Sequence, residues 1–254
     1  MVVSAVLFDL SGVLYVGGEA VPGAVHALEK LRAAGVPHRF VTNVTRTPSV
    51  ELVRRLTGMG FAVTAGNLFS APIAARDYLK ARQLRPFMLI HPALEQEFAD
   101  LRRDSPDAVL LGDAGDGFSY ENLNRAFRLL MAGAPLLAMG NNRYFQEADG
   151  LSLDIGPFVS ALAYASGASA TILGKPAKEF FIAALESLGC PASEAVMIGD
   201  DALADVEGAL RAGMQGILVQ TGKYRAGDER QIKRPGAVVL TDVAAAVEWI
   251  LKRR

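Results

Sequence analysis

The sequence has a single cysteine, Cys190, so the chain cannot form an intrachain disulfide. It also lacks a run of about 18 apolar residues, the length that a membrane-spanning helix requires, and we therefore expect no membrane span. The amino terminus shows no charged leader and no apolar signal core, which makes the cytoplasm the expected compartment. A formal charge of −1 leaves no excess of Lys and Arg for a nucleic-acid surface.

Sequence motifs and repeats that would indicate other classes of protein are also missing. No Gly-x-Gly-x-x-Gly motif follows the first predicted strand, which argues against dinucleotide binding. We find no repeat of fixed period and no low-complexity segment. What remains is an ordinary globular composition, with 51% hydrophobic and 21% charged residues among 254. That length is sufficient for one large domain or two smaller ones, each with a buried core.

Apolar runs alternate with amphipathic segments along most of the chain. The first run, residues 3–8, ends abruptly at Asp9 and lacks the polar alternation of a half-exposed strand. A helical pattern over residues 23–34 and a second apolar run over residues 38–41 follow it. This rhythm is typical of βαβ units. The sequence therefore predicts an α/β fold with a Rossmann-like parallel-sheet core.

The middle of the chain continues the alternation but is self-contained. Its strands and covering helices occupy roughly a hundred residues, which is enough for a small domain. We predict an inserted, smaller α/β cap domain over residues 72–167 and a core domain from residues 1–71 and 168–254. Within the cap, residues 140–156 are expected to form a polar, glycine-rich loop. A strand over residues 170–173 is expected to return the chain to the core.

Reactive or phosphate-binding residue types follow four predicted strands. They are Asp9, Thr42 with Asn43, Lys175, and Asp200 with Asp201. Parallel strands end at one edge of their sheet, where ligands collect in open α/β folds, so we expect these side chains to lie together. Carboxylates suit a divalent cation, whereas hydroxyl, amide and ammonium groups suit phosphate oxygens.

Each of these positions also has a purely structural explanation. Asp9 and the pair Thr42–Asn43 are common turn and cap residues. The pair Asp200–Asp201 suits a helix N-terminus, and Lys175 before a proline suits an exposed loop. Four such endings in one sheet favour a shared site over four independent caps.

Four motifs carry a resemblance to a known family. They are Asp9-Leu-Ser11-Gly12, Val41-Thr42-Asn43, Gly174-Lys175-Pro176 and Gly199-Asp200-Asp201-Ala-Leu-Ala-Asp205. As a set they resemble the motifs of haloacid dehalogenase-type phosphatases, and the insertion is similar to the large α/β cap of the subgroup with nucleotide-monophosphate and 4-nitrophenyl phosphatases. The resemblance is closer still to the phospholysine phosphohistidine inorganic pyrophosphate phosphatases, through stretches such as Phe118-Ser-Tyr-Glu-Asn122 and Thr221-Gly-Lys-Tyr-Arg225.

The resemblance implies a Mg²⁺-dependent phosphatase. Asp9 is the expected nucleophile and forms an aspartyl-phosphate. Mg²⁺ is expected between Asp9, the backbone carbonyl of Ser11 and Asp200. Asp201 and Asp205 are expected to steady the water shell of the ion.

The phosphate group itself is expected to contact residues from three motifs. They are Asp9, Leu10 and Ser11 from the first, Thr42 and Asn43 from the second, and Lys175 from the third. Lys175 is expected to bridge the nucleophile and the phosphate and to offset the repulsion between two anions. Asp9, Ser11 and Lys175 make up the expected catalytic set.

Ser11 departs from the family pattern, because many members carry there an Asp that acts as general acid and base. A serine hydroxyl is too weak an acid for that role, so substrates whose leaving groups depart unaided are favoured. Pyrophosphate, phosphoramidates and aryl phosphates meet this condition better than alkyl phosphates. Two alternatives stay open: a low-turnover protein that uses the phosphate site for binding or regulation, and a phosphotransferase.

The cap is expected to roof the site and so to select small phosphorylated substrates. The candidate specificity residues are Asn141, Asn142, Arg143, Tyr144 and His91, and a place on the cap surface or in a dimer contact is an equally good explanation for each. By similarity to related proteins, we also expect a homodimer formed through the cap.

Overall fold

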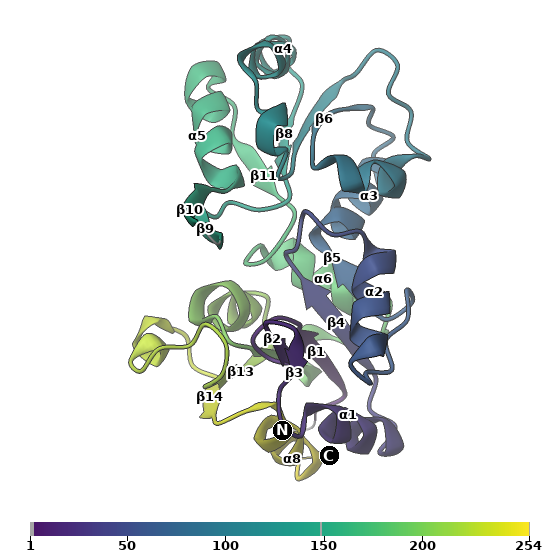
Figure 1. The fold of residues 1–254 in the computed structure, drawn as a ribbon, viewed down its shortest axis with the longest axis vertical. Helices are drawn as coiled ribbons and strands as arrows, with labels where there is room; N and C mark the ends of the chain where they lie inside the picture. Colours follow the sequence, from purple (N-terminus) through teal and green to yellow (C-terminus); the bar gives the residue numbers. More distant parts are fainter. Residues whose placement is uncertain (1–2, 148, 254) are drawn as a thin grey trace. The chain divides into compact units, whose positions relative to one another are not determined.

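The computed structural model describes residues 3–147 and 149–253. They form two compact units (Figure 1). The first consists of the chain up to Thr42, of Val50–Phe69, and of the chain from Lys175 onward, and the second consists of Asn43–Ser49 and Ser70–Gly174. The cap domain over residues 72–167 stays a prediction, because compactness does not test whether a segment folds or acts independently. No helix within the described residues has the length and hydropathy needed to cross a membrane.

A six-stranded sheet forms the centre of the first unit, in the order β14-β13-β12-β1-β4-β5. Its strands are β1 (Ala5–Asp9), β4 (His38–Thr42), β5 (Leu68–Ser70), β12 (Ala195–Gly199), β13 (Gln215–Val219) and β14 (Ala237–Leu240). β1 pairs in parallel with β4 on one side and with β12 on the other. All five residues of β1 are buried, as an apolar run without polar alternation predicts.

Helices cover both faces of this sheet. One face packs against α1 (Ala24–Ala33), α2 (Ser49–Gly58) and α8 (Val243–Leu251), whose apolar residues join Val6 and Phe8 in one core. On the other face, Val206 and Leu210 pack against Leu218 of β13. These two residues belong to a π-helical turn, η4 (Ala202–Glu207), and to α7 (Gly208–Arg211), next to α6 (Lys178–Glu186). The first unit also contains the 3₁₀ turns η3 (Ala192–Glu194) and η5 (Asp228–Gln231).

The second unit is built on a four-stranded parallel sheet in the order β11-β8-β7-β6. Its strands are β6 (Pro86–Leu89), β7 (Ala108–Leu111), β8 (Leu136–Ala138) and β11 (Ala170–Ile172). The helical elements are α3 (Ala71–Ala81), η1 (Pro92–Phe98), η2 (Gly115–Gly117), α4 (Tyr120–Met131) and α5 (Ile155–Ser166). The two sheets with their helices confirm the predicted α/β fold.

The structure corrects the expected path of the chain near residue 170. The strand expected to return the chain to the core is β11, and it pairs with β8 at the edge of the second sheet. The chain rejoins the first unit at Lys175. The sequence of so short a strand does not indicate which sheet it will join. β11 can pair in parallel with β8 because α5, which lies between them in the chain, provides the crossover connection.

Two hairpins were not predicted. One joins β9 (Tyr144–Glu147) to β10 (Gly150–Leu153) inside the segment expected to be a loop. The other joins β2 (Tyr15–Val16) to β3 (Glu19–Ala20) directly after the first motif. Two-stranded ribbons are marginal on their own, so their formation depends on neighbours that a local pattern does not contain.

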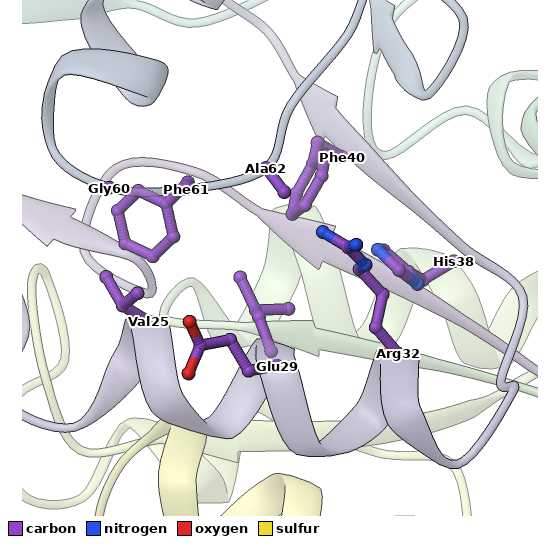
Figure 2. A pocket seen from close by; sticks show the side chains of 9 residues that line it. Val25, Glu29, Arg32, His38, Phe40, Gly60, Phe61 and Ala62 are labelled. Carbon is purple, nitrogen blue, oxygen red and sulfur yellow. The ribbon is translucent and has the colours of Figure 1, made fainter.

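A small hollow lies beside the amino-terminal end of β4 (Figure 2). Its lining comes from α1, from β4 and from the loop after α2: Val25, Leu28, Glu29, Arg32, His38, Phe40, Gly60, Phe61 and Ala62. His38 begins β4 and Thr42 ends it. The hollow therefore lies toward the amino-terminal ends of the strands, whereas the expected catalytic residues lie at their carboxyl ends.

Candidate active site at the carboxyl edge of the first sheet

The register of the central strands aligns the residues at their ends. Asp9 is the last residue of β1 and lies opposite Val41 of β4, so Thr42 stands one position beyond it. On the other side Phe8 lies opposite Ile198, so Asp200 also stands one position beyond Asp9. The carboxyl edge of the sheet therefore brings together side chains that are far apart in the sequence.

Lys175 connects two of the carboxylates at this edge. Its ammonium Nζ donates to Asp9 Oδ1 at 2.5 Å and to Asp205 Oδ1 at 2.6 Å. The three residues are buried, with exposed fractions of 5% for Lys175, 8% for Asp9 and 1% for Asp205. Burial lowers the pKa of Lys175, but attraction by Asp205 and Asp9 outweighs it and keeps the pKa above its usual value. Lys175 is thus a buried, permanently charged group.

Asp9, Asp200 and Asp205 form a buried acidic cluster. One carboxylate oxygen from each lies within 4.8 Å of the other two. Burial raises the pKa of Asp9, and raises the pKa values of Asp200 and Asp205 to about 6. Three carboxylates thus share one ammonium, and a hard divalent cation with oxygen ligands fits the negative charge left over.

Asp201 and Asp205 have well-defined partners within the same loop. Asp201 caps η4, because its Oδ1 accepts the N–H groups of Leu203 at 3.0 Å and Ala204 at 2.9 Å. Asp205 Oδ2 accepts the N–H of Asp201 at 3.2 Å, while its Oδ1 is bonded to Lys175. The capping function considered for Asp201 is therefore present, and Asp205 directly anchors the lysine.

The loop after β1 approaches Asp200 closely. A Cβ atom on Gly12 would lie 1.8 Å from Asp200 Oδ2, and Gly12 has a φ of +88°. Only glycine satisfies both conditions.

The two residues before Gly12 differ in exposure. Ser11 is exposed, and its hydroxyl bonds to the phenol of Tyr15, whose pKa is raised chiefly by burial. Leu10 has a fully buried side chain, and its N–H bonds to Asp9.

The sequence and the fold are similar to those of known proteins. The sequence model of haloacid dehalogenase-like hydrolases matches residues 6–102, and that of a HAD-hydrolase-like group matches residues 172–246. Haloacid dehalogenase-like hydrolase domain-containing protein 2 from Homo sapiens is 47% identical over 248 residues, which cover 98% of this chain and 96% of the human protein. The chain belongs to the haloacid dehalogenase-like hydrolases. This confirms the predicted family and enzyme class, a phosphohydrolase.

Two further similarities extend over nearly the whole hydrolase. The phospholysine phosphohistidine inorganic pyrophosphate phosphatase of Bos taurus is 43% identical over 258 residues, covering 98% of this chain and 95% of its own. The crystal structure of a 4-nitrophenylphosphatase from Thermotoga maritima matches with a TM-score of 0.88 at 26% identity. That match covers 98% of this chain and 97% of the other.

The remaining candidate residues of this haloacid dehalogenase-like hydrolase lie in the second unit. Asn43 belongs to that unit, and so do His91 and Asn141–Tyr144. His91 is the N-cap of η1, with Nδ1 accepting the N–H of Ala93 at 3.2 Å. Tyr144 begins β9 and is 55% exposed. His91 thus has a structural function, whereas about half of Tyr144 is exposed.

Sequence reasoning missed the contribution of the loop after β13. The backbone N–H of Lys223 donates to Asp200 Oδ2 at 2.7 Å, and the hydroxyl of Thr221 donates to the Gly12 carbonyl at 2.5 Å. The stretch Thr221-Gly-Lys supported the family resemblance, but no role followed from it. The available signal was its position, since it follows a strand of the same parallel sheet.

Proposed function

We propose that this hydrolase is a Mg²⁺-dependent phosphatase that works through an aspartyl-phosphate on Asp9. One observation carries the proposal: Asp9 ends a central strand with Oδ1 held by a buried lysine, next to the carboxylates of Asp200 and Asp205. Binding a phosphate alone would favour cations and N–H donors. A cluster of acidic groups beside the phosphate site instead suits a nucleophile and a cation site.

The ligands proposed for the ion are Asp9, Asp200 and the backbone carbonyl of Ser11. Such an all-oxygen set is what Mg²⁺ prefers, with water and phosphate completing its coordination. When bound, the ion would neutralise charge on the transferring phosphoryl group and keep Asp9 ionised. Asp205 is already engaged by Lys175, so we assign it to holding the lysine.

The reaction proceeds in two displacements. A carboxylate oxygen of Asp9 attacks phosphorus, the bond from phosphorus to the leaving group breaks, and the leaving group departs with the electron pair. A water oxygen then attacks the same phosphorus, the bond to Asp9 breaks, phosphate is released, and the water proton passes to phosphate or solvent. Lys175 offsets the repulsion between Asp9 and the phosphoryl oxygens, and the Thr42 hydroxyl donates to one of those oxygens.

The proposed substrates are pyrophosphate, phosphoramidates such as phospholysine and phosphohistidine, and aryl phosphates. Ser11 provides no carboxylic acid to protonate a leaving group, and general acid catalysis is worth about 10²–10⁴ in rate. Phosphate and phenolate leave as stable anions, and the nitrogen of a phosphoramidate is protonated before its bond breaks. The names of the similar phosphatases from Bos taurus and Thermotoga maritima agree with these classes.

The test measures Mg²⁺-dependent phosphate release from pyrophosphate, an aryl phosphate and an alkyl phosphate, by the wild type and by Ser11→Asp. If leaving-group protonation is what Ser11 lacks, the variant gains most on the alkyl ester. If hydrolysis of the aspartyl-phosphate is slow, all three substrates speed up together. A wild type that prefers the alkyl ester would contradict the proposed specificity.

The two alternative functions, a phosphotransferase and a binding or regulatory protein, can be distinguished from a phosphatase by their products. A phosphotransferase would form a new phosphate ester when alcohols or amines are added, at the expense of free phosphate. A binding or regulatory protein would retain phosphate without releasing it at a measurable rate. Product analysis with added acceptors separates both from the phosphatase.

We further propose a homodimer formed through the second unit and a cytoplasmic location. The hairpin β9–β10 supports the dimer, because Tyr144 and Leu153 are cross-strand partners and are 55% and 63% exposed. Exposed apolar neighbours of this kind mark contact surfaces. Sedimentation of the full chain should give twice the monomer mass, and a monomer at micromolar concentration would exclude the dimer.

A further inference from the structure

We propose that Thr221 is a positioning residue: by fixing the peptide plane after Gly12 it steadies the turn that carries the Ser11 carbonyl, and so it strengthens binding of the divalent cation. The inference rests on the cation-dependent function proposed above. It concerns the loop Thr221–Lys223, which follows β13 and contacts both Gly12 and Asp200.

Both backbone polar groups of Gly12 are hydrogen-bonded. The Gly12 N–H donates to the Tyr15 carbonyl at 2.7 Å, and the Gly12 carbonyl accepts the Thr221 hydroxyl at 2.5 Å. The first contact orients the peptide plane that joins Ser11 to Gly12, and the second orients the plane that follows. Because a peptide unit is planar and trans, the first plane also contains the Ser11 carbonyl and directs it away from Tyr15.

Gly12 needs this support more than another residue would. Its φ of +88° lies in the left-handed region, and because glycine has no Cβ, its backbone dihedrals are less restricted than those of other residues. Tyr15 alone fixes one of the two planes, which leaves rotation about Gly12 possible. The Thr221 hydroxyl comes from a residue 209 positions away in the sequence and fixes the second plane. Together the two hydrogen bonds hold Gly12 in one conformation.

The same loop also holds the second proposed ligand. The Lys223 N–H donates to Asp200 Oδ2 at 2.7 Å, which restricts rotation of that carboxylate. Gly222 makes the close approach possible, because a Cβ there would lie 2.1 Å from Asp200 Oδ2 and 2.3 Å from the Gly12 Cα. One short loop therefore sets the geometry of a ligand on β12 and of the turn after β1. Groups that orient metal ligands in this way commonly change metal affinity by 10–100-fold.

The experiment compares three variants in the absence of substrate. Thr221→Val keeps the shape and removes the hydroxyl, whereas Thr221→Ser keeps the hydroxyl. Thr241→Val is the matched control, because Thr241 follows the neighbouring strand β14 and its hydroxyl contacts Asp242 at 3.4 Å. The dissociation constant of Mg²⁺ is measured by isothermal titration calorimetry on each full chain. We expect about a tenfold weaker Kd for Thr221→Val and values within about twofold of the wild type for the other two.

The outcomes separate this inference from the proposed function. An unchanged Kd in Thr221→Val, or equal weakening in Thr221→Ser, would overturn the role of the hydroxyl while cation binding stands. A wild type that binds no divalent cation would overturn both. Circular dichroism checks each fold, and Thr221→Ala, which adds no atom to the site, replaces Thr221→Val if the latter misfolds.

Discussion

Replacing Lys175 by Met should destabilise the protein strongly and in a pH-dependent way. Met keeps the length of the side chain but removes the ammonium that bonds to Asp9 and Asp205. Those carboxylates then remain buried, next to Asp200, without a cation. Removing one partner of a buried ion pair costs about 3–5 kcal/mol. With a urea slope of about 2.5 kcal/mol/M, the unfolding midpoint at pH 7.5 should fall by about 1–2 M.

The pH dependence follows from the carboxylates. Burial already raises the pKa of Asp205 to about 6 from an ordinary 3.8, and losing Lys175 would raise the pKa values of Asp205 and Asp9 further. A carboxyl with a raised pKa in the folded state favours folding at low pH, and this contribution is lost as the pH rises through that value. The deficit of Lys175→Met should therefore shrink by about 1–3 kcal/mol between pH 7.5 and pH 5.

The assay is urea denaturation in EDTA, followed by circular dichroism at both pH values. Lys80→Met is the control, because Lys80 pairs with Asp100 while both side chains are largely exposed, and it should leave the urea midpoint nearly unchanged. The double variant Lys175→Met/Asp205→Asn should recover part of the loss, since it removes one unpaired charge. A loss below about 1 kcal/mol for Lys175→Met, or the same loss at both pH values, would refute the reasoning.

Three further predictions concern catalysis and the cation. Asp9→Asn should fold, with thermal stability at least equal to that of the wild type because one buried charge is removed, and should release no phosphate; wild-type turnover by this variant would exclude Asp9 as the nucleophile. Asp200→Asn should weaken Mg²⁺ binding by about 10–100-fold, and activity should partly return at high Mg²⁺, so a variant with normal affinity would remove Asp200 from the ligand set. Lowering the pH from 7.5 to 5 should weaken Mg²⁺ binding by about tenfold or more, because the pKa of Asp200 is about 6 and protons then compete for it; calorimetry showing no pH dependence would contradict this.

Local patterns in the sequence were sufficient for much of the architecture. The apolar run ending at Asp9 forms β1, and the helical pattern over residues 23–34 contains α1. The apolar run over residues 38–41 forms the first four residues of β4. These elements depend on burial and on periodicity along the chain, which neighbouring residues express directly. The family motifs supplied the candidates for the site in the same way.

Only the tertiary structure decided which of these elements and residues meet. β11 belongs to the second sheet, although its sequence does not indicate this. The hairpins β2–β3 and β9–β10 likewise had no clear pattern in the local sequence. Asp205 anchors Lys175, a contact that no local pattern predicts, and Lys175 also reaches Asp9 across 166 positions in the sequence. Thr221 reaches Gly12 across 209. Such pairings depend on how strands align in three dimensions, and residues so far apart leave no periodic trace in one sequence.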